Sequence, residues 1–207
     1  MSTYAAAVRS TRSCFDHHAA LVSRQGEGIA LADMDGDSDI DVAFGARLLE
    51  NPAEAGSARA AHVISPAWPS DTRVRAVDMN ADARTDVVLT ASEGSGRVSW
   101  FQAPATAGGA WQEHRISEAG LNGAHSLVVA DLDGDRDPDV AVAEMHTSLG
   151  KRILNFINDG GDRWRVQTLA TSGSHNMQAA DLDGDGDVDL VGRITRVRIA
   201  DSSTGRI

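Results

Sequence analysis

Residues 181–189 read Asp-Leu-Asp-Gly-Asp-Gly-Asp-Val-Asp, so nine residues carry five carboxylates at alternate positions. Like charges a few ångströms apart repel by about 1 kcal/mol per pair even in a high dielectric. A hard divalent cation removes that repulsion, and Ca²⁺ binds oxygens from alternate loop positions together with a backbone carbonyl. The run therefore predicts a calcium loop whose ligands are the side chains of Asp181, Asp183, Asp185 and Asp189 and the carbonyl of Asp187.

The same run occurs three more times. Residues 33–41 read Asp-Met-Asp-Gly-Asp-Ser-Asp-Ile-Asp, residues 131–139 read Asp-Leu-Asp-Gly-Asp-Arg-Asp-Pro-Asp, and residues 78–86 read Asp-Met-Asn-Ala-Asp-Ala-Arg-Thr-Asp. The starts of the four runs are separated by 45, 53 and 50 residues. A period of this length is typical of propeller blades. Solvated acidic hairpins without metal are the simpler alternative, but they do not explain why the same oxygen positions recur in each repeat.

The acidity of the chain is concentrated in these runs. The 207 residues carry a net charge of −11, and the four runs hold 18 of the 30 acidic residues. Each Ca²⁺ adds two charges, so four ions would bring the net charge from −11 to −3. A protein without a basic footprint is a poor candidate for nucleic-acid binding, so we expect no nucleic-acid partner.

The composition of the chain also bears on the compartment in which the protein works. Cys14 is the only cysteine, so no intrachain disulfide forms. No stretch approaches the roughly 20 apolar residues of a membrane span, and residues 1–12 lack the apolar core of a signal peptide. Calcium is abundant outside cells, which favours an extracellular or cell-envelope location. The missing signal then predicts a trimmed chain or an incomplete reading frame; otherwise the protein works where calcium is scarce.

Residues around each run alternate between apolar and polar, as in Asp39–Phe44, and four such segments occur per repeat. We therefore predict an all-β fold, a β-propeller of four-stranded antiparallel blades over residues 14–207. The blades are expected at about 27–64, 73–117, 125–170 and 176–200, after a disordered segment 1–13. The last blade lacks an outer strand. Residues 15–22 are predicted to supply it and close a four-bladed ring, although the four repeats fit an arc of a larger propeller equally well.

The extended pattern Asp-Leu-Asp-Gly-Asp-Gly-Asp-Val-Asp-Leu, between a first and a second strand, resembles the FG-GAP/VCBS repeat, the calcium-loop module of integrin α-chain propellers. The resemblance covers about residues 27–192, and Phe44-Gly45-Ala46 matches the motif behind the family name in the first repeat only. Members of this family are often longer and seven-bladed. The resemblance thus implies a calcium-binding propeller and leaves the number of blades open.

The resemblance implies up to four Ca²⁺, one per blade. Their side-chain ligands would be Asp33, Asp35, Asp37, Asp41, Asp78, Asn80, Asp82, Asp86, Asp131, Asp133, Asp135, Asp139, Asp181, Asp183, Asp185 and Asp189, and their backbone carbonyl ligands Asp39, Arg84, Asp137 and Asp187. Ala81 replaces a glycine of the pattern, and only Gly186 is a glycine at the sixth position. Glycine adopts positive φ without steric cost, so we expect residues 78–86 to bind calcium most weakly and residues 181–189 most strongly.

The loops at the opposite end of the blades carry the candidate ligand-binding residues His125, Glu144, His146 and His175. His125 and His175 occupy the same repeat position, which is compatible with a second metal site, a sugar site, or two structural turn residues. We interpret the chain as an extracellular recognition or adhesion module for a glycan or a protein. The alternative is a sugar-active enzyme, a polysaccharide lyase or sugar dehydratase, with a His/Glu site at this end. No catalytic residue is assigned, because every strong motif is of the metal-binding type.

Overall fold

A computed structural model of the chain describes residues 27–51, 60–69, 71–106, 108–117, 120–192 and 196–197. This part of the chain consists of strands and turns, and no helix in it is long and apolar enough to cross a membrane. The strand expected at 15–22, the disorder expected for 1–13 and residues 193–195 and 198–200 of the fourth expected blade lie outside the described residues. The prediction of an all-β chain is confirmed over the described part.

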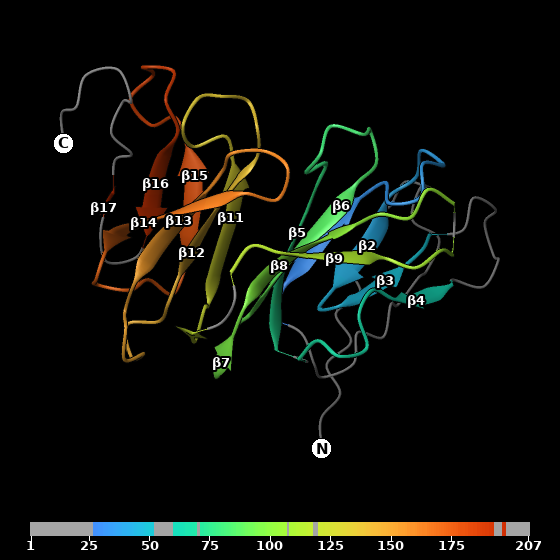
Figure 1. The fold of residues 1–207 in the computed structure, drawn as a ribbon, viewed down its shortest axis with the longest axis horizontal. Helices are drawn as coiled ribbons and strands as arrows, with labels where there is room; N and C mark the ends of the chain where they lie inside the picture. The colour runs from blue at the N-terminus through green and yellow to red at the C-terminus, as the bar shows by residue number, and fades with distance from the viewer. Residues whose placement is uncertain are drawn as a thin grey trace, which may run out of the picture.

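Four antiparallel sheets follow one another along the chain and stand in a row (Figure 1). The first sheet contains β1 (Ile29–Ala32), β2 (Asp41–Phe44), β3 (Arg47–Leu49) and β4 (Ala61–Val63). The second contains β5 (Thr72–Val77), β6 (Asp86–Ala91), β8 (Val98–Gln102) and β9 (Gln112–Arg115). The third contains β11 (Ser126–Ala130), β12 (Asp139–Ala143), β13 (Ile153–Asn158) and β14 (Trp164–Ala170). The fourth contains β15 (Met177–Ala180), β16 (Asp189–Gly192) and β17 (Arg196–Val197).

The repeated four-stranded antiparallel sheet is therefore confirmed for the first three repeats, and the fourth has three described strands. A short ribbon of β7 (Ser95–Gly96) and β10 (Leu121–Asn122) connects the loop inside the second sheet to the approach to the third. The four acidic runs are the hairpins between the first two strands of each sheet, and they lie along the upper side of the row in Figure 1.

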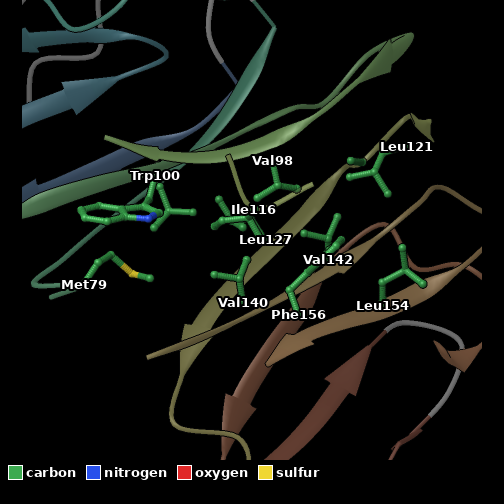
Figure 2. Close-up of a cluster of buried hydrophobic side chains, with 12 residues drawn as sticks. Met79, Val98, Trp100, Ile116, Leu121, Leu127, Val140, Val142, Leu154 and Phe156 are labelled. Carbon is green, nitrogen blue, oxygen red and sulfur yellow. The ribbon is translucent and has the colours of Figure 1, made fainter. Parts of the chain in front are cut away.

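The cores lie between consecutive sheets. The first strands contact one another in order, β1 with β5, β5 with β11 and β11 with β15. One hydrophobic cluster fills each gap, and the cluster between the second and third sheets includes Val98, Trp100, Leu127, Val140 and Phe156 (Figure 2). All six residues of β6 are buried, because this strand has a neighbouring sheet on both sides. β6 is therefore mostly apolar (Asp-Val-Val-Leu-Thr-Ala), whereas the edge strand β14 is largely exposed.

Candidate calcium loops and the opposite end of the sheets

The acidic runs are held at both ends by strands. We name them loop 1 (33–41), loop 2 (78–86), loop 3 (131–139) and loop 4 (181–189), each with positions 1 to 9. Position 1 directly follows the first strand of its sheet, and position 9 is the first residue of the second strand. The strand register therefore fixes the two end carboxylates of every loop, and positions 2 to 8 make the turn.

The backbone of each loop wraps around the carboxylate at position 1. In loop 1, Asp33 accepts hydrogen bonds from the N–H groups of Gly36 (2.7 Å) and Ser38 (3.0 Å). Positions 4 and 6 have positive φ in all four loops: Gly36 (85°), Ser38 (75°), Ala81 (58°), Ala83 (64°), Gly134 (84°), Arg136 (81°), Gly184 (77°) and Gly186 (94°). A side chain in this conformation costs about 1–2 kcal/mol, whereas glycine pays no such cost. Loop 4, with two glycines, is therefore the least strained loop, and loop 2, with two alanines, is among the most strained.

Three loops bring carboxylates close enough to hold one ion. In loops 1, 3 and 4, oxygens of three residues lie within 4.8 Å of one another: Asp33, Asp35 and Asp37; Asp131, Asp133 and Asp139; and Asp181, Asp183 and Asp189. Burial, and then repulsion from Asp135, raises the pKa of Asp133. Its Oδ1 is buried and has no hydrogen-bond partner among the described residues, while its Oδ2 lies 3.5 Å from Arg165 Nη2. An unpartnered carboxylate oxygen beside two other carboxylates fits a hard cation such as Ca²⁺.

Loop 2 is built differently, because its own side chains neutralise the carboxylate at position 5. Asp82 Oδ2 accepts hydrogen bonds from the Arg84 guanidinium, from Asn80 Nδ2 (3.0 Å) and from Gln102 Nε2 (3.1 Å). Burial alone would raise the pKa of Asp82, but these three partners outweigh it and the pKa is lowered. The shift is opposite to that of Asp133 in loop 3. In loop 2, an arginine side chain and two amides thus bind the Asp82 carboxylate, as a cation would in the other loops.

Position 9 has a structural role that the sequence analysis did not predict. Asp139 is fully buried, and its Oδ2 accepts from Leu132 N–H (2.8 Å) while its Oδ1 accepts from Asn158 N–H (2.8 Å) at the end of β13. Asp41 and Asp86 make the same pair of bonds in their own sheets. Burial raises the pKa of both Asp86 and Asp139 to about 6. Each of these carboxylates connects its loop to the second and third strands of the sheet. The sequence signal for this role was the aspartate that stands at position 9 of all four runs.

At the opposite end, His125 lies in a cluster drawn from all four repeats. The side chain is 6% exposed, and its ring lies against that of His175 at a tilt of 36°, with ring centroids 4.2 Å apart. Arg73 Nη2 lies 2.7 Å from His125 Nδ1, and His125 Nε2 lies 3.0 Å from a Glu27 oxygen and 3.1 Å from a Glu93 oxygen. Arginine only donates, so Nδ1 is the acceptor and Nε2 carries the hydrogen. The structure thus brings His125 and His175 together, adding Glu27 and Arg73, which sequence reasoning missed.

Tautomer assignment decides what the His125 cluster can bind. Three ligand atoms of Glu27, Glu93 and His125 lie within 4.8 Å of one another. A metal ion would need the lone pair of Nε2, but that nitrogen carries the hydrogen because Arg73 occupies Nδ1. The two carboxylates share the N–H of His125, Arg73 Nη2 lies 3.7 Å from Glu27 Oε2, and the Glu27 and Glu93 side chains are 33% and 50% exposed. Two carboxylates and one guanidinium leave the cluster with a net negative charge, which suits a cationic group arriving from outside.

Glu144 and His146 do not join this cluster as accessible ligands. The Glu144 side chain is 1% exposed, and it accepts hydrogen bonds from Arg152 Nη2 (2.6 Å), Arg152 N–H (2.9 Å) and Asn122 N–H (3.0 Å). Burial raises the pKa of Glu144, but the bonds from Arg152 and Asn122 outweigh it, so the pKa is lowered. His146 is exposed on the turn after β12. A ligand would have to displace Arg152 to reach Glu144.

The comparison with protein families agrees with the geometry of the loops. Residues 78–142 match the family described as the FG-GAP-like repeat, a segment that runs from loop 2 through loop 3 into β12. The resemblance drawn from the acidic runs is thereby confirmed over this segment. A search of curated proteins gave no match.

Proposed function

We propose that the chain is a calcium-binding β-propeller module that recognises a partner protein outside the cell. The observation that carries this proposal is the grouping of three carboxylates within 4.8 Å in each of loops 1, 3 and 4. The match to the FG-GAP-like repeat supports the same class, in which the propeller is an adhesion-type module. The four sheets in a row, each with its loop on the same side, are compatible with blades of a propeller.

In loops 1, 3 and 4, Ca²⁺ would be held by the side chains at positions 1, 3, 5 and 9 and by the carbonyl at position 7. When bound, the ion neutralises carboxylates that otherwise repel one another and fixes the hairpin between the first two strands. We propose three ions rather than four, because Arg84 and Asn80 already satisfy Asp82 in loop 2.

A calcium titration tests this proposal. After removal of metal with EDTA, isothermal titration with CaCl₂ is expected to give three sites per chain. Asp133→Ala should reduce the number to two, whereas Asp82→Ala should leave it at three. When the free calcium concentration is 100 times the dissociation constant of a site, binding there stabilises the fold by about 2.7 kcal/mol. The midpoint temperature of thermal unfolding should therefore rise with calcium. No binding would overturn the metal assignment, and four sites would show that Arg84 does not close loop 2.

Recognition is proposed at the opposite end, at the cluster of Glu27, Glu93, His125 and His175. Glu27 and Glu93 share the hydrogen on His125 Nε2, Arg73 Nη2 lies 3.7 Å from Glu27 Oε2, and the two glutamate side chains remain 33% and 50% exposed. A lysine or arginine side chain of a partner protein can supply further donors to them. This arrangement favours a protein partner over a glycan. The enzymatic alternative has no comparable support, because Glu144 is fully engaged by Arg152 and Asn122.

A displayed peptide library provides a probe for this end. Peptides selected on the calcium-loaded protein are expected to contain lysine or arginine at a fixed position. Binding of those peptides should weaken at least tenfold in the Glu27→Gln/Glu93→Gln variant, since both acceptors lose their charge. Glu113→Gln is the control, because Glu113 pairs with Arg97 on the second sheet. Equal binding to all three proteins would place the recognition surface elsewhere.

A further inference from the structure

One face of the first sheet carries exposed apolar side chains, although Phe44 on the same face is 8% exposed. Ile29 and Leu31 in β1 are 58% and 64% exposed. Val63 in β4, on the same face by strand register, is 47% exposed. Alternate residues of β1 point the other way, where Ala30 and Ala32 pack against the second sheet. A strand at a true edge of a soluble protein would carry polar residues on its outer face, so this face has the composition of a buried one.

The repeat shows what normally covers this face. Ile29 lies four residues before loop 1, and the residues at that position in the next three sheets are Val74, Leu127 and Met177, which are 0%, 1% and 2% exposed. Those three side chains are buried because each packs against the preceding sheet in the row. Ile29 therefore occupies the position that faces a preceding sheet. Among the described residues the first sheet has none.

The fourth sheet exposes the opposite kind of face, the one that packs against a following sheet in the other repeats. Val191 in β16 is 36% exposed, whereas the residues at its repeat position, Ala43, Val88 and Ala141, are all 0% exposed. Those three face the following sheet in the row. Gln178 and Ala180 in β15, on the same face as Val191, are also exposed. Among the described residues, the first and fourth sheets thus carry two complementary halves of one repeated sheet-to-sheet interface.

These two halves lie at opposite ends of the molecule. β1 to β4 and β15 to β17 form the two ends of the row along its longest axis (Figure 1). We propose that the free face of the first sheet packs against the free face of the fourth sheet of a second copy of this chain. Two copies make this contact twice and close a ring of eight sheets, within the range known for propellers. The proposal rests on the packing of the sheets and is independent of calcium binding.

The mass of the protein in solution gives the first test. Light scattering at about 50 µM, with calcium and with EDTA, is expected to give twice the 21.8 kDa of one chain. A single-chain mass would overturn the proposal and favour cover by another part of the same chain. A series of larger multiples would also overturn it, because the contact would then propagate without closing a ring.

Two surface variants identify the faces. Leu31→Asp and Val191→Asp should each weaken self-association at least 100-fold, since every dimer contact contains both residues. Mixing the two variants should restore a two-chain species, because one contact then pairs two unaltered faces. Leu149→Asp, at a residue 98% exposed in a turn outside both faces, should leave the dimer intact. Circular dichroism checks that each variant is folded. A dimer that survives Val191→Asp, or a mixture that stays monomeric, would rule out the proposed pairing.

Discussion

Asp139→Asn is expected to lower the free energy of unfolding by about 3 kcal/mol at pH 7, measured by urea denaturation in EDTA. Both carboxylate oxygens of Asp139 accept backbone N–H groups, from Leu132 and Asn158, at 2.8 Å each. An asparagine keeps one acceptor and turns an N–H₂ donor towards the other N–H. One buried N–H donor therefore loses its partner and faces another donor, which costs about 1–3 kcal/mol. Burial raises the pKa of Asp139 to about 6, so the loss comes from the second acceptor and not from the negative charge.

The measurement needs EDTA, because position 9 is also a candidate calcium ligand and the two effects must be separated. Asp137→Asn is the matched control in the same loop. Asp137 is exposed, and its loss should change stability by less than about 0.5 kcal/mol. Equal effects of the two substitutions would show that Asp139 is not the tie between β12, β13 and the loop.

The repeated strands were predictable because their signal is local. Alternation around each acidic run depends on neighbours in the chain, and so does positive φ at position 6, where Gly186 stands in the run with the best pattern. These two features belong to a single hairpin, so one repeat is sufficient to infer them. The return of the run after about 50 residues required comparison of all four runs, and the printed sequence contains them.

Hydrogen bonds between residues far apart in the sequence could not be predicted from the acidic runs. The second donor to Asp139 comes from Asn158, at the end of a strand 19 residues away. Arg84 was assigned as a carbonyl ligand by its position, and nothing in the run indicated that its guanidinium would reach Asp82. Arg73 contacts His125 although the two residues are 52 positions apart in the sequence, so the tautomer of that histidine could not be predicted either. Polar partners of this kind are set by how sheets pack and not by spacing within a loop.

The exposed face of the first sheet could not be predicted for a different reason. Ile29 and Val74 occupy equivalent positions and are both apolar, yet one is 58% exposed and the other is 0% exposed. Every repeat carries the residues needed to pack on a preceding sheet, so the pattern alone does not tell a terminal repeat from an internal one. The structure shows which faces have a neighbouring sheet among the described residues.

Glu144→Ala is expected to lower the free energy of unfolding by about 4 kcal/mol at pH 7. Glu144 joins three segments, because it accepts from Arg152 at the start of the third sheet's third strand and from Asn122 in β10. Its removal leaves the N–H groups of Arg152 and Asn122 without an acceptor and opens a cavity beside Gly150. The Arg152 side chain is 37% exposed and keeps its bond to the Gly120 carbonyl, so the main cost is the two orphaned N–H groups, about 1–3 kcal/mol each. The measurement is urea denaturation monitored by tryptophan fluorescence.

The pH dependence distinguishes this ion pair from simple packing. The bonds from Arg152 and Asn122 hold the pKa of Glu144 below its ordinary value of 4.5, despite the opposing effect of burial. A carboxyl group with a depressed folded-state pKa stabilises the protein fully above its unfolded pKa and loses that contribution as the pH falls through the folded pKa. The difference between wild type and Glu144→Ala should therefore be constant above about pH 5 and shrink at lower pH. Glu113→Ala is the control for an exposed Glu–Arg pair, and it should cost no more than about 1 kcal/mol. A difference for Glu144→Ala that does not change between pH 7 and pH 3 would mean that its shape, and not its charge, supports the fold.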